Sequence, residues 1–116
     1  MLTKLDHIDI KAADFDATVR TLLDMGLVIT RRAPAPRNSV EMSLPGENQV
    51  VLEIHPAKEG GFTGIHHIAF QTDGGDLEAL KAKGITFKTE NMLIKDTGRT
   101  VSSFSDPNGL TWQLAD

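Results

Sequence analysis

The chain has 116 residues, a net charge of −4, 40% hydrophobic residues, 24% charged residues and no cysteine. This length suits one domain around one hydrophobic core, and the composition is that of an ordinary globular protein. The acidic balance argues against nucleic acid or an anionic membrane as partner, and the lack of cysteine excludes disulfides and thiolate chemistry. No stretch approaches membrane-spanning length and no apolar signal segment opens the chain, so we expect a cytoplasmic protein.

The first half of the chain predicts a strand, a helix and three further strands. Residues 3–11 alternate between polar and apolar side chains, which is typical of a strand. Asp14 is a candidate N-cap for a helix with one apolar face, and Gly26 has the place of a C-cap glycine. A loop with two prolines is expected at residues 31–38. The further strands are expected at residues 27–30, 40–44 and 49–55.

The second half repeats this order after a glycine-rich connector at residues 56–64. A helix is expected at residues 76–83, and Gly84 follows it as Gly26 follows the first helix. The strands are expected at residues 65–71, 85–88, 99–104 and 110–114.

An internal repeat relates the two halves, because adding sixty to a residue number carries one onto the other. The matching segments are residues 5–8 with 65–68 and residues 52–54 with 112–114. Each match keeps a polar residue between apolar neighbours. We therefore expect a single α+β domain over residues 1–116, built from two βαβββ modules at about 1–58 and 62–116.

The polar residues kept by the repeat fall on one face of the expected strands. His7 is repeated as His67, and Glu53 is repeated as Gln113. Glu41 is expected on the same face of a neighbouring strand. Side chains alternate between the faces of a strand, so the apolar faces can pack under the helices while the polar faces line a concave sheet. Two imidazoles and two acyl oxygens aimed at one centre form a candidate metal site.

Four motifs, in order along the whole chain, resemble those of the vicinal oxygen chelate superfamily, the group of glyoxalase I, bleomycin-resistance proteins and methylmalonyl-CoA epimerase. The motifs are LDHIDI, VVLEIHP, GIHHIAF and SFSDPNGLTWQL. They resemble the two metal-histidine strands of the family, the strand of its first acidic ligand, and the hairpin with the last strand. The resemblance implies a half-open eight-stranded barrel, the glyoxalase/bleomycin-resistance fold, around one divalent metal.

The resemblance also implies a set of metal ligands, His7, Glu53, His67 and Gln113. Gln113 departs from the family, which usually has Glu there, so this position is either a ligand or one that has lost its role. Two imidazoles and two oxygens suit a borderline ion: Ni, Co, Zn, Mn or Fe. The ion would act as a Lewis acid in proton abstraction next to a carbonyl, stabilising an enediolate. Glu53 and Glu41 are the candidate catalytic groups that move the proton.

Other residues are candidates for substrate binding. Residues 31–37 hold three of the cations of the chain, and Arg37 is a candidate clamp for a carboxylate, a phosphate or a coenzyme A thioester. The alternative is a solvated loop. Ser43 and Ser103 are further substrate-binding candidates. The histidines His55 and His66 are expected at the surface or behind the metal ligands.

These features favour an enzyme, a metal-dependent lyase or isomerase similar to lactoylglutathione lyase (glyoxalase I) or to an epimerase. The alternative is a metal-free, bleomycin-resistance-type protein that binds an antibiotic, although five Phe, one Trp and no Tyr offer few rings for stacking. A dioxygenase with His7, His67 and Glu53 around Fe(II) ranks last, because family dioxygenases usually have longer chains. We expect a small-molecule substrate and a homodimer, since a half-open sheet leaves unpaired edges.

Overall fold

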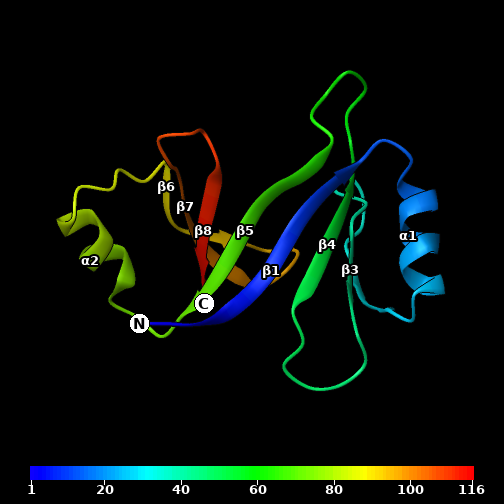
Figure 1. The fold of residues 1–116 in the computed structure, drawn as a ribbon, viewed down its shortest axis with the longest axis horizontal. Helices are drawn as coiled ribbons and strands as arrows, with labels where there is room; N and C mark the ends of the chain where they lie inside the picture. Colours follow the sequence, from blue (N-terminus) through cyan, green and yellow to red (C-terminus); the bar gives the residue numbers. More distant parts are fainter. The chain divides into compact units, whose positions relative to one another are not determined.

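The computed structural model describes all residues from 1 to 116 and contains eight strands and two helices (Figure 1). The strands are β1 (Leu2–Ala12), β2 (Val28–Arg32), β3 (Val40–Ser43), β4 (Val51–Pro56), β5 (Gly64–Thr72), β6 (Thr89–Ile94), β7 (Arg99–Ser105) and β8 (Thr111–Ala115). The helices are α1 (Phe15–Asp24) and α2 (Asp76–Ala82). The predicted α+β class and the βαβββ order of each half are confirmed. Neither helix has the length and apolar character that crossing a membrane requires.

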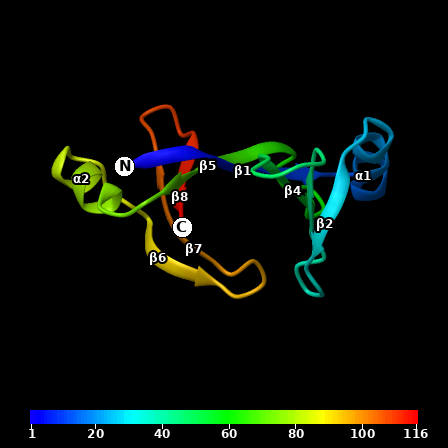
Figure 2. The same cartoon turned by 90° about the horizontal axis from the view of Figure 1, so that it is seen from below.

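The chain divides into two compact units. The N-terminal unit comprises His7–His66, and the C-terminal unit comprises Met1–Asp6 with His67–Asp116. The strands follow the order β2-β3-β4-β1 in the first and β5-β8-β7-β6 in the second. Figure 2 labels β1, β2 and β4 of the first unit and β5, β6, β7 and β8 of the second. The pairs β1–β4 and β5–β8 are parallel and the other pairs within each unit are antiparallel, so both units have the same topology. Strands β2 and β6 are the end strands of the order, and they do not pair with each other. The predicted module boundaries near residues 58 and 62 stay a prediction.

In the N-terminal unit, α1 lies beside β3 and β4 (Figure 1) and packs apolar side chains against the core. Asp14 caps the helix as predicted, because its side chain accepts a hydrogen bond from the Ala17 N–H at 3.0 Å. After the helix, Gly26 has a φ of 102°, which favours glycine and lets the chain turn toward β2. The core cluster under the helix consists of Ala12, Leu27, Val40, Met42 and Ile54, with Phe15, Val19 and Leu22 of α1 packed against it.

The C-terminal unit has a smaller apolar cluster and an ion pair. The buried members of the cluster are Ala69, Val101 and Ala115. The rings of Phe87, which precedes β6, and of Phe104 in β7 meet edge to face, with centroids 5.0 Å apart. Asp6 and Arg99 form a partly buried ion pair, with Oδ2 and Nε 2.9 Å apart. This pair holds Asp6 of β1 to β7 in the second half of the chain.

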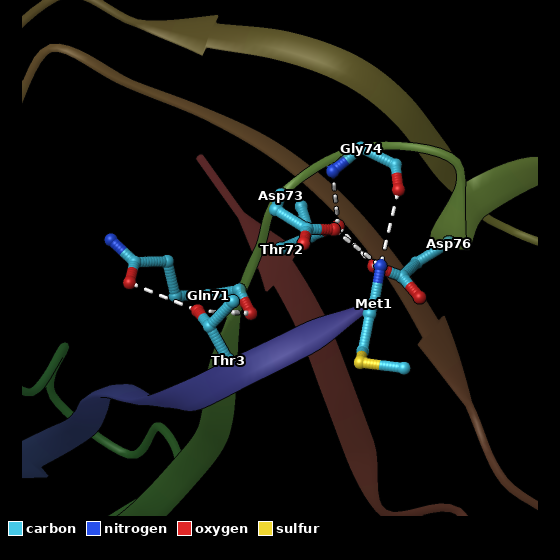
Figure 3. A network of polar contacts seen from close by, with 7 residues as sticks. All are labelled: Met1, Thr3, Gln71, Thr72, Asp73, Gly74 and Asp76. Carbon is cyan, nitrogen blue, oxygen red and sulfur yellow. Dashed lines mark hydrogen bonds and ion pairs between the residues drawn. The ribbon is translucent and has the colours of Figure 1, made fainter.

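Further contacts attach the start of β1 to the segment before α2, as Figure 3 shows. The Met1 ammonium lies 2.8 Å from Oδ2 of Asp76 and also contacts Asp73. The Thr3 hydroxyl donates to the side-chain oxygen of Gln71 at 3.0 Å. These polar contacts explain why the first residues of the chain belong to the C-terminal unit.

The strand predicted at residues 85–88 is wrong. This segment is an irregular connection between α2 and β6. It is anchored by one core side chain, Phe87, which is 9% exposed. Two backbone hydrogen bonds hold its ends, from the Ile85 N–H to the Leu80 carbonyl at 3.1 Å and from the Lys88 N–H to the Ser103 carbonyl at 2.8 Å. Apolar residues that anchor a connection resemble a short strand in sequence, because both are brief apolar runs.

Bulges explain two strands whose extent the sequence did not predict. Strand β6 contains Asn91 with a φ of 51°, and its register against β7 shifts at this point, which interrupts the alternation of side chains. In β2 the register against β3 shifts between Ile29 and Arg31, and the strand continues through Arg32. The loop predicted at residues 31–38 therefore begins later than expected.

Candidate functional site

One face of the strands in the N-terminal unit carries a row of buried polar side chains. They occupy alternate positions of β1, β3 and β4, so they share the face opposite the apolar core. The members of this acidic cluster are His7, Asp9, Glu41, Ser43, Glu53 and His55, none more than 8% exposed. Charged side chains are seldom buried unless they are paired or hold an ion. The acidic cluster is therefore the candidate functional site.

The strand register places three carboxylates in one row across neighbouring strands. Asp9 of β1 is in register with Glu53 of β4, and Glu53 is in register with Glu41 of β3. Residues paired in this way have Cβ atoms about 5 Å apart, and like charges so placed repel one another. The row therefore requires compensating positive charge.

His55 supplies part of this positive charge. Its Nε2 atom lies 2.7 Å from Oε1 of Glu53 and 2.7 Å from Oδ2 of Asp9. A ring nitrogen carries at most one proton, so a single N–H is shared between two carboxylates. Two cations flank this bridge. Lys11 Nζ lies 3.2 Å from Oδ1 of Asp9. Arg37 Nη1 lies 3.9 Å from Oε1 of Glu53.

These surroundings shift two pKa values in opposite directions. Burial lowers the pKa of His55, but hydrogen bonds to Asp9 and Glu53 outweigh burial and leave this pKa above its ordinary value. Burial raises the pKa of Glu53, but the hydrogen bond and the charge of His55, with a contribution from His7, leave this pKa below its ordinary value. Both shifts favour an imidazolium beside a carboxylate.

Five of the predicted site residues lie in or beside the acidic cluster, and Glu53, described above, is one of them. His7 and Glu41 share its buried face, and the charge of His7 contributes to the lowered pKa of Glu53. Ser43 is also buried there, and its hydroxyl donates to the Leu44 carbonyl at 3.0 Å. Arg37 lies at the border of the cluster. The structure thus brings these residues together, while their roles stay predictions.

The other three predicted residues lie in the C-terminal unit. Gln113 of β8 is in register with Ala69 of β5 on one side and with Ser103 of β7 on the other. His67 is in register with Thr111, which shares the face of Gln113 on the same strand. The side chains of His67, Ser103 and Gln113 are partly buried. The predicted set of four metal ligands therefore has two members in each unit, and its assembly around one ion stays a prediction.

Asp9 and His55 are functional candidates that the sequence analysis did not select. A surface position for His55 is wrong, since this residue is 6% exposed, whereas a place behind Glu53 agrees with their contact. Each residue follows a predicted ligand by two positions, Asp9 after His7 and His55 after Glu53. The period of two in a strand is the signal that would have found both.

A cavity of about 570 Å³ adjoins the acidic cluster in the N-terminal unit. The ring of His55 forms part of its wall. The other polar and aromatic side chains that line it are Lys11, Arg37, Asn38, Lys58, Phe62 and His66. No Asp or Glu is among the lining residues. A cavity of this size accommodates a small organic molecule.

The acidic cluster has the donor chemistry of a divalent metal site. Ligand atoms of Asp9, Glu53 and His55 all lie within 4.8 Å of one another. Donors to one ion at ordinary bond lengths lie about 3 Å apart, so small side-chain shifts would suffice. An imidazole with carboxylates suits Zn, Mn, Fe(II), Co or Ni, and a dication would neutralise the row of carboxylates. With His55 deprotonated, these residues fit a divalent ion, which would take the place of the shared proton between the carboxylates.

Two βαβββ halves with an open strand order, and a buried polar face beside a cavity, define a class of paired-module proteins. Over residues 4–114 the sequence matches the profile of the Glyoxalase/Bleomycin resistance protein/Dioxygenase superfamily. The chain belongs to this superfamily, which confirms the resemblance seen in its four motifs. No curated protein matches the sequence.

Solved structures with the same fold include methylmalonyl-CoA epimerases. A variant of the Streptomyces coelicolor enzyme in complex with 2-nitronate-propionyl-CoA has a TM-score of 0.79 at 22% identity, covering 99% of this chain and 97% of that chain. The Mycobacterium tuberculosis methylmalonyl-CoA epimerase has a TM-score of 0.78 at 20% identity, covering 98% and 87%. A hypothetical protein from Bacillus halodurans C-125 has a TM-score of 0.77 at 19% identity, covering 97% and 92%. These similarities confirm the predicted glyoxalase/bleomycin-resistance fold.

Proposed function

We propose that the chain is a divalent-metal-dependent isomerase of the epimerase type, which removes and returns a proton next to the carbonyl of a small acidic substrate. The observation that carries this proposal is the row of three buried carboxylates, two of them bridged by His55, beside a cavity of about 570 Å³. Such a reaction requires a base within reach of the substrate and positive charge near its carbonyl oxygen. The acidic cluster supplies the base. The names of the epimerases among the similar structures add support for this reaction type.

We assign the metal to His7 and Glu53 of the N-terminal unit and to His67 and Gln113 of the C-terminal unit, following the superfamily pattern. The burial of His7 and Glu53 and the electrostatic effect of one on the other support the first half of this assignment. When bound, the ion supplies positive charge that stabilises negative charge on a substrate oxygen. The hydrogen bond from His55 orients the Glu53 carboxylate, as the partners of metal ligands commonly do.

We assign the first proton transfer to Glu41, which is buried next to Glu53 in the carboxylate row. Glu41 takes the proton from the carbon next to the carbonyl, and the electron pair of the C–H bond moves toward the carbonyl, whose oxygen gains the negative charge. A proton that returns to the opposite face of the same carbon inverts the centre. In this scheme the proton comes from the His55 N–H, which lies 2.7 Å from Oε1 of Glu53, and Glu53 relays it and returns to its carboxylate form. Release of the proton from Glu41 and reprotonation of His55 restore the cluster.

Exchange of the substrate proton with solvent deuterium tests this function. The chain is incubated in D₂O with methylmalonyl-CoA and with related acyl thioesters, in the presence of each candidate ion, and mass spectrometry measures deuterium uptake. Loss of a general base slows such steps about 10²–10⁴-fold. We therefore expect Glu41→Gln and Glu53→Gln to slow exchange at least about 100-fold.

Glu47 provides a matched control, because it is an exposed glutamate in the turn between β3 and β4. Glu47→Gln is expected to exchange at the native rate. Native exchange in the Glu41→Gln variant would contradict the assignment of the base, and a native chain that exchanges none of the thioesters with any ion would contradict the proposed reaction.

Binding of an antibiotic without metal, the alternative function, has less support. Phe62 is the only Phe, Tyr or Trp side chain that lines the cavity, and three buried carboxylates do not serve the stacking of a planar drug. Quenching of Trp112 fluorescence by bleomycin without any metal requirement would favour this alternative.

We also propose a homodimer, and its support comes from the outer strands. Strands β2 and β6 stand at the two ends of the strand order and pair on one side only. They expose Val28, Met92 and Leu93, which are 43%, 45% and 59% exposed. Unpaired edges with apolar side chains are commonly covered by another chain. Sedimentation equilibrium is expected to give twice the mass of one chain, and the monomer mass would contradict the proposal.

A further inference from the structure

The cavity of the N-terminal unit collects positive charge in an acidic chain. The chain has 12 basic and 16 acidic residues, yet three basic side chains and no acidic side chain line the cavity. Lys11 comes from the end of β1, Arg37 from the loop before β3, and Lys58 from the loop after β4. Three segments far apart in sequence therefore place their cations at one cavity.

Two of these cations are held in position before any ligand binds. Lys11 is 28% exposed and contacts the buried carboxylate of Asp9 at 3.2 Å. The side chain of Arg37 is 32% exposed, and its loop is closed by a backbone hydrogen bond from Ala33 to Ser39 at 2.9 Å. Side chains that are already ordered lose less entropy when they bind an anion. Arg31 and Arg32, the other arginines of the predicted cationic loop, do not line this cavity.

A glycine turn fixes the backbone of the third cationic residue, Lys58, beside the cavity. The Gly61 N–H donates to the Lys58 carbonyl at 2.8 Å, and Gly60 has a φ of 72°, as the third residue of a type II turn requires. A Cβ atom on Gly61 would lie 3.0 Å from the Lys58 carbonyl oxygen, so this close approach favours glycine. The turn therefore determines where the backbone of Lys58 lies, from which its side chain reaches the cavity.

The cavity wall also determines what kind of anion would fit. Pro36, Pro56 and Phe62 give it apolar surface beside the cations, which suits an organic anion better than an inorganic ion. His55 belongs both to this wall and to the acidic cluster. Without intervening cations, the buried carboxylates of that cluster would repel an acidic substrate.

We propose that this cavity is an anion-binding site for the phosphate or carboxylate group of an organic substrate. Lys11, Arg37 and Lys58 bind the anionic group, and the rest of the molecule extends past His55 toward the acidic cluster. The role as a substrate site rests on the proposed function, whereas the binding of an organic anion does not.

Calorimetric titration of the intact, metal-free chain tests the site with two probes that separate the sources of charge. Phenyl phosphate presents a phosphate and phenylacetate a carboxylate, each with a ring. We expect at least one probe to bind the native chain, and Arg37→Gln/Lys58→Gln to weaken that binding at least about tenfold, since charge-assisted contacts are lost. Binding of one probe alone identifies the anionic group. Failure of both probes to bind, at low salt, would overturn the proposal.

A second double variant, which removes two positive charges elsewhere on the chain, controls for the overall electrostatic field of the protein. Arg32→Gln/Lys88→Gln removes two exposed cations outside the cavity and is expected to bind within about twofold of the native chain. Equal weakening by both double variants would overturn the proposal. If circular dichroism shows that the cavity variant is unfolded, Lys58→Gln alone is measured, because its side chain is exposed. It is expected to weaken binding at least about threefold, and unchanged binding would overturn the proposal.

The deuterium-exchange assay on the same proteins separates this inference from the proposed function. Anion binding that depends on the cavity cations, without proton exchange, would contradict the proposed function and leave the anion site standing. Proton exchange in a native chain that binds neither probe would contradict the anion site and leave the proposed function standing.

Discussion

The two units of the chain use one backbone plan for two different interiors. The registers of β1 with β4 and of β5 with β8 coincide when sixty is added to each residue number. This offset carries Asp9, Glu53 and His55 onto Ala69, Gln113 and Ala115. Ala69 and Ala115 are 0% and 1% exposed and belong to the apolar cluster of the C-terminal unit. The positions of Asp9 and His55 are therefore taken by small apolar residues in the other unit, and the position of Glu53 is taken by a neutral Gln.

This difference shows which features determine the fold and which determine the chemistry. Both units keep the alternation of the strands, the glycine after the helix and the parallel pairing of their first and last strands. Only the N-terminal unit combines these features with a bridged pair of buried carboxylates. Substitutions in that unit should upset a charge balance, whereas substitutions at the matching positions of the other unit should only alter packing.

The largest expected effect is that of His55→Ala. This change removes the N–H that Asp9 and Glu53 share, and removal of one partner from a buried ion pair costs about 3–5 kcal/mol. Urea denaturation of the metal-free protein measures the free energy of unfolding. Lys95→Ala, at an exposed cation outside the acidic cluster, is the control and should change it by less than about 0.5 kcal/mol. A loss below about 1 kcal/mol in His55→Ala would show that the shared N–H does not hold the cluster.

A triple variant makes the N-terminal unit resemble the C-terminal unit. Asp9→Ala/Glu53→Gln/His55→Ala introduces the residues that the C-terminal unit has at the matching positions. Replacement of a whole buried charge cluster is tolerated better than removal of one partner, so this variant should be about 2 kcal/mol more stable than His55→Ala. The same urea titration measures both. Equal or lower stability of the triple variant would show that the two interiors are not interchangeable.

Gln113→Glu tests the same comparison from the other unit, because it makes a neutral candidate ligand match Glu53. One additional anionic ligand should strengthen metal binding about tenfold, measured by competition with a chelator. Asn108→Asp adds the same charge at an exposed position of the β7–β8 turn and is expected to leave the affinity unchanged. Unchanged or weaker binding in Gln113→Glu would remove Gln113 from the ligand set.

The smallest expected effect concerns a turn of the C-terminal unit. The indole N–H of Trp112 donates a hydrogen bond to Asp106 at 3.0 Å. This hydrogen bond holds the pKa of Asp106 below its ordinary value of 3.8. Burial opposes the shift slightly, and hydrogen bonds from backbone N–H groups add to it. A lowered pKa means that the contact contributes stability above pH 3.8 and loses it as the pH falls through the folded-state pKa. Fluorescence of Trp112, the one tryptophan, should therefore change only below pH 3.8, and should not titrate in Asp106→Asn. A change centred above pH 3.8 would contradict this contact.

The repeat in the sequence predicts the strands of the site but not every residue on them. The offset of sixty holds for the strands that carry the four predicted ligands. On the next strand it fails, because Glu41 is in register with Glu53, whereas Ser103, sixty-two residues beyond Glu41, is in register with Gln113. The reason is turn length, since seven residues join β3 to β4 and five join β7 to β8.

The charge balance of the site could not be predicted from the sequence. Alternation places Asp9 and His55 on the face of His7 and Glu53, but it does not determine that one imidazole meets two carboxylates. That contact depends on the parallel register of β1 with β4, which residue patterns alone leave open. Strand β6 escaped prediction for a similar reason, because its bulge at Asn91 breaks the pattern that identifies a strand.

The central claim is that the buried carboxylates serve a metal-dependent reaction, and elemental analysis of protein purified without a metal-affinity tag tests it most directly. We predict about one Ni, Co, Zn, Mn or Fe per chain. The double variant His7→Ala/His67→Ala is expected to retain less than about a tenth of this metal, because each imidazole is a candidate ligand. A native protein that holds no metal after dialysis against excess divalent ions would contradict the claim and favour a metal-free binding protein.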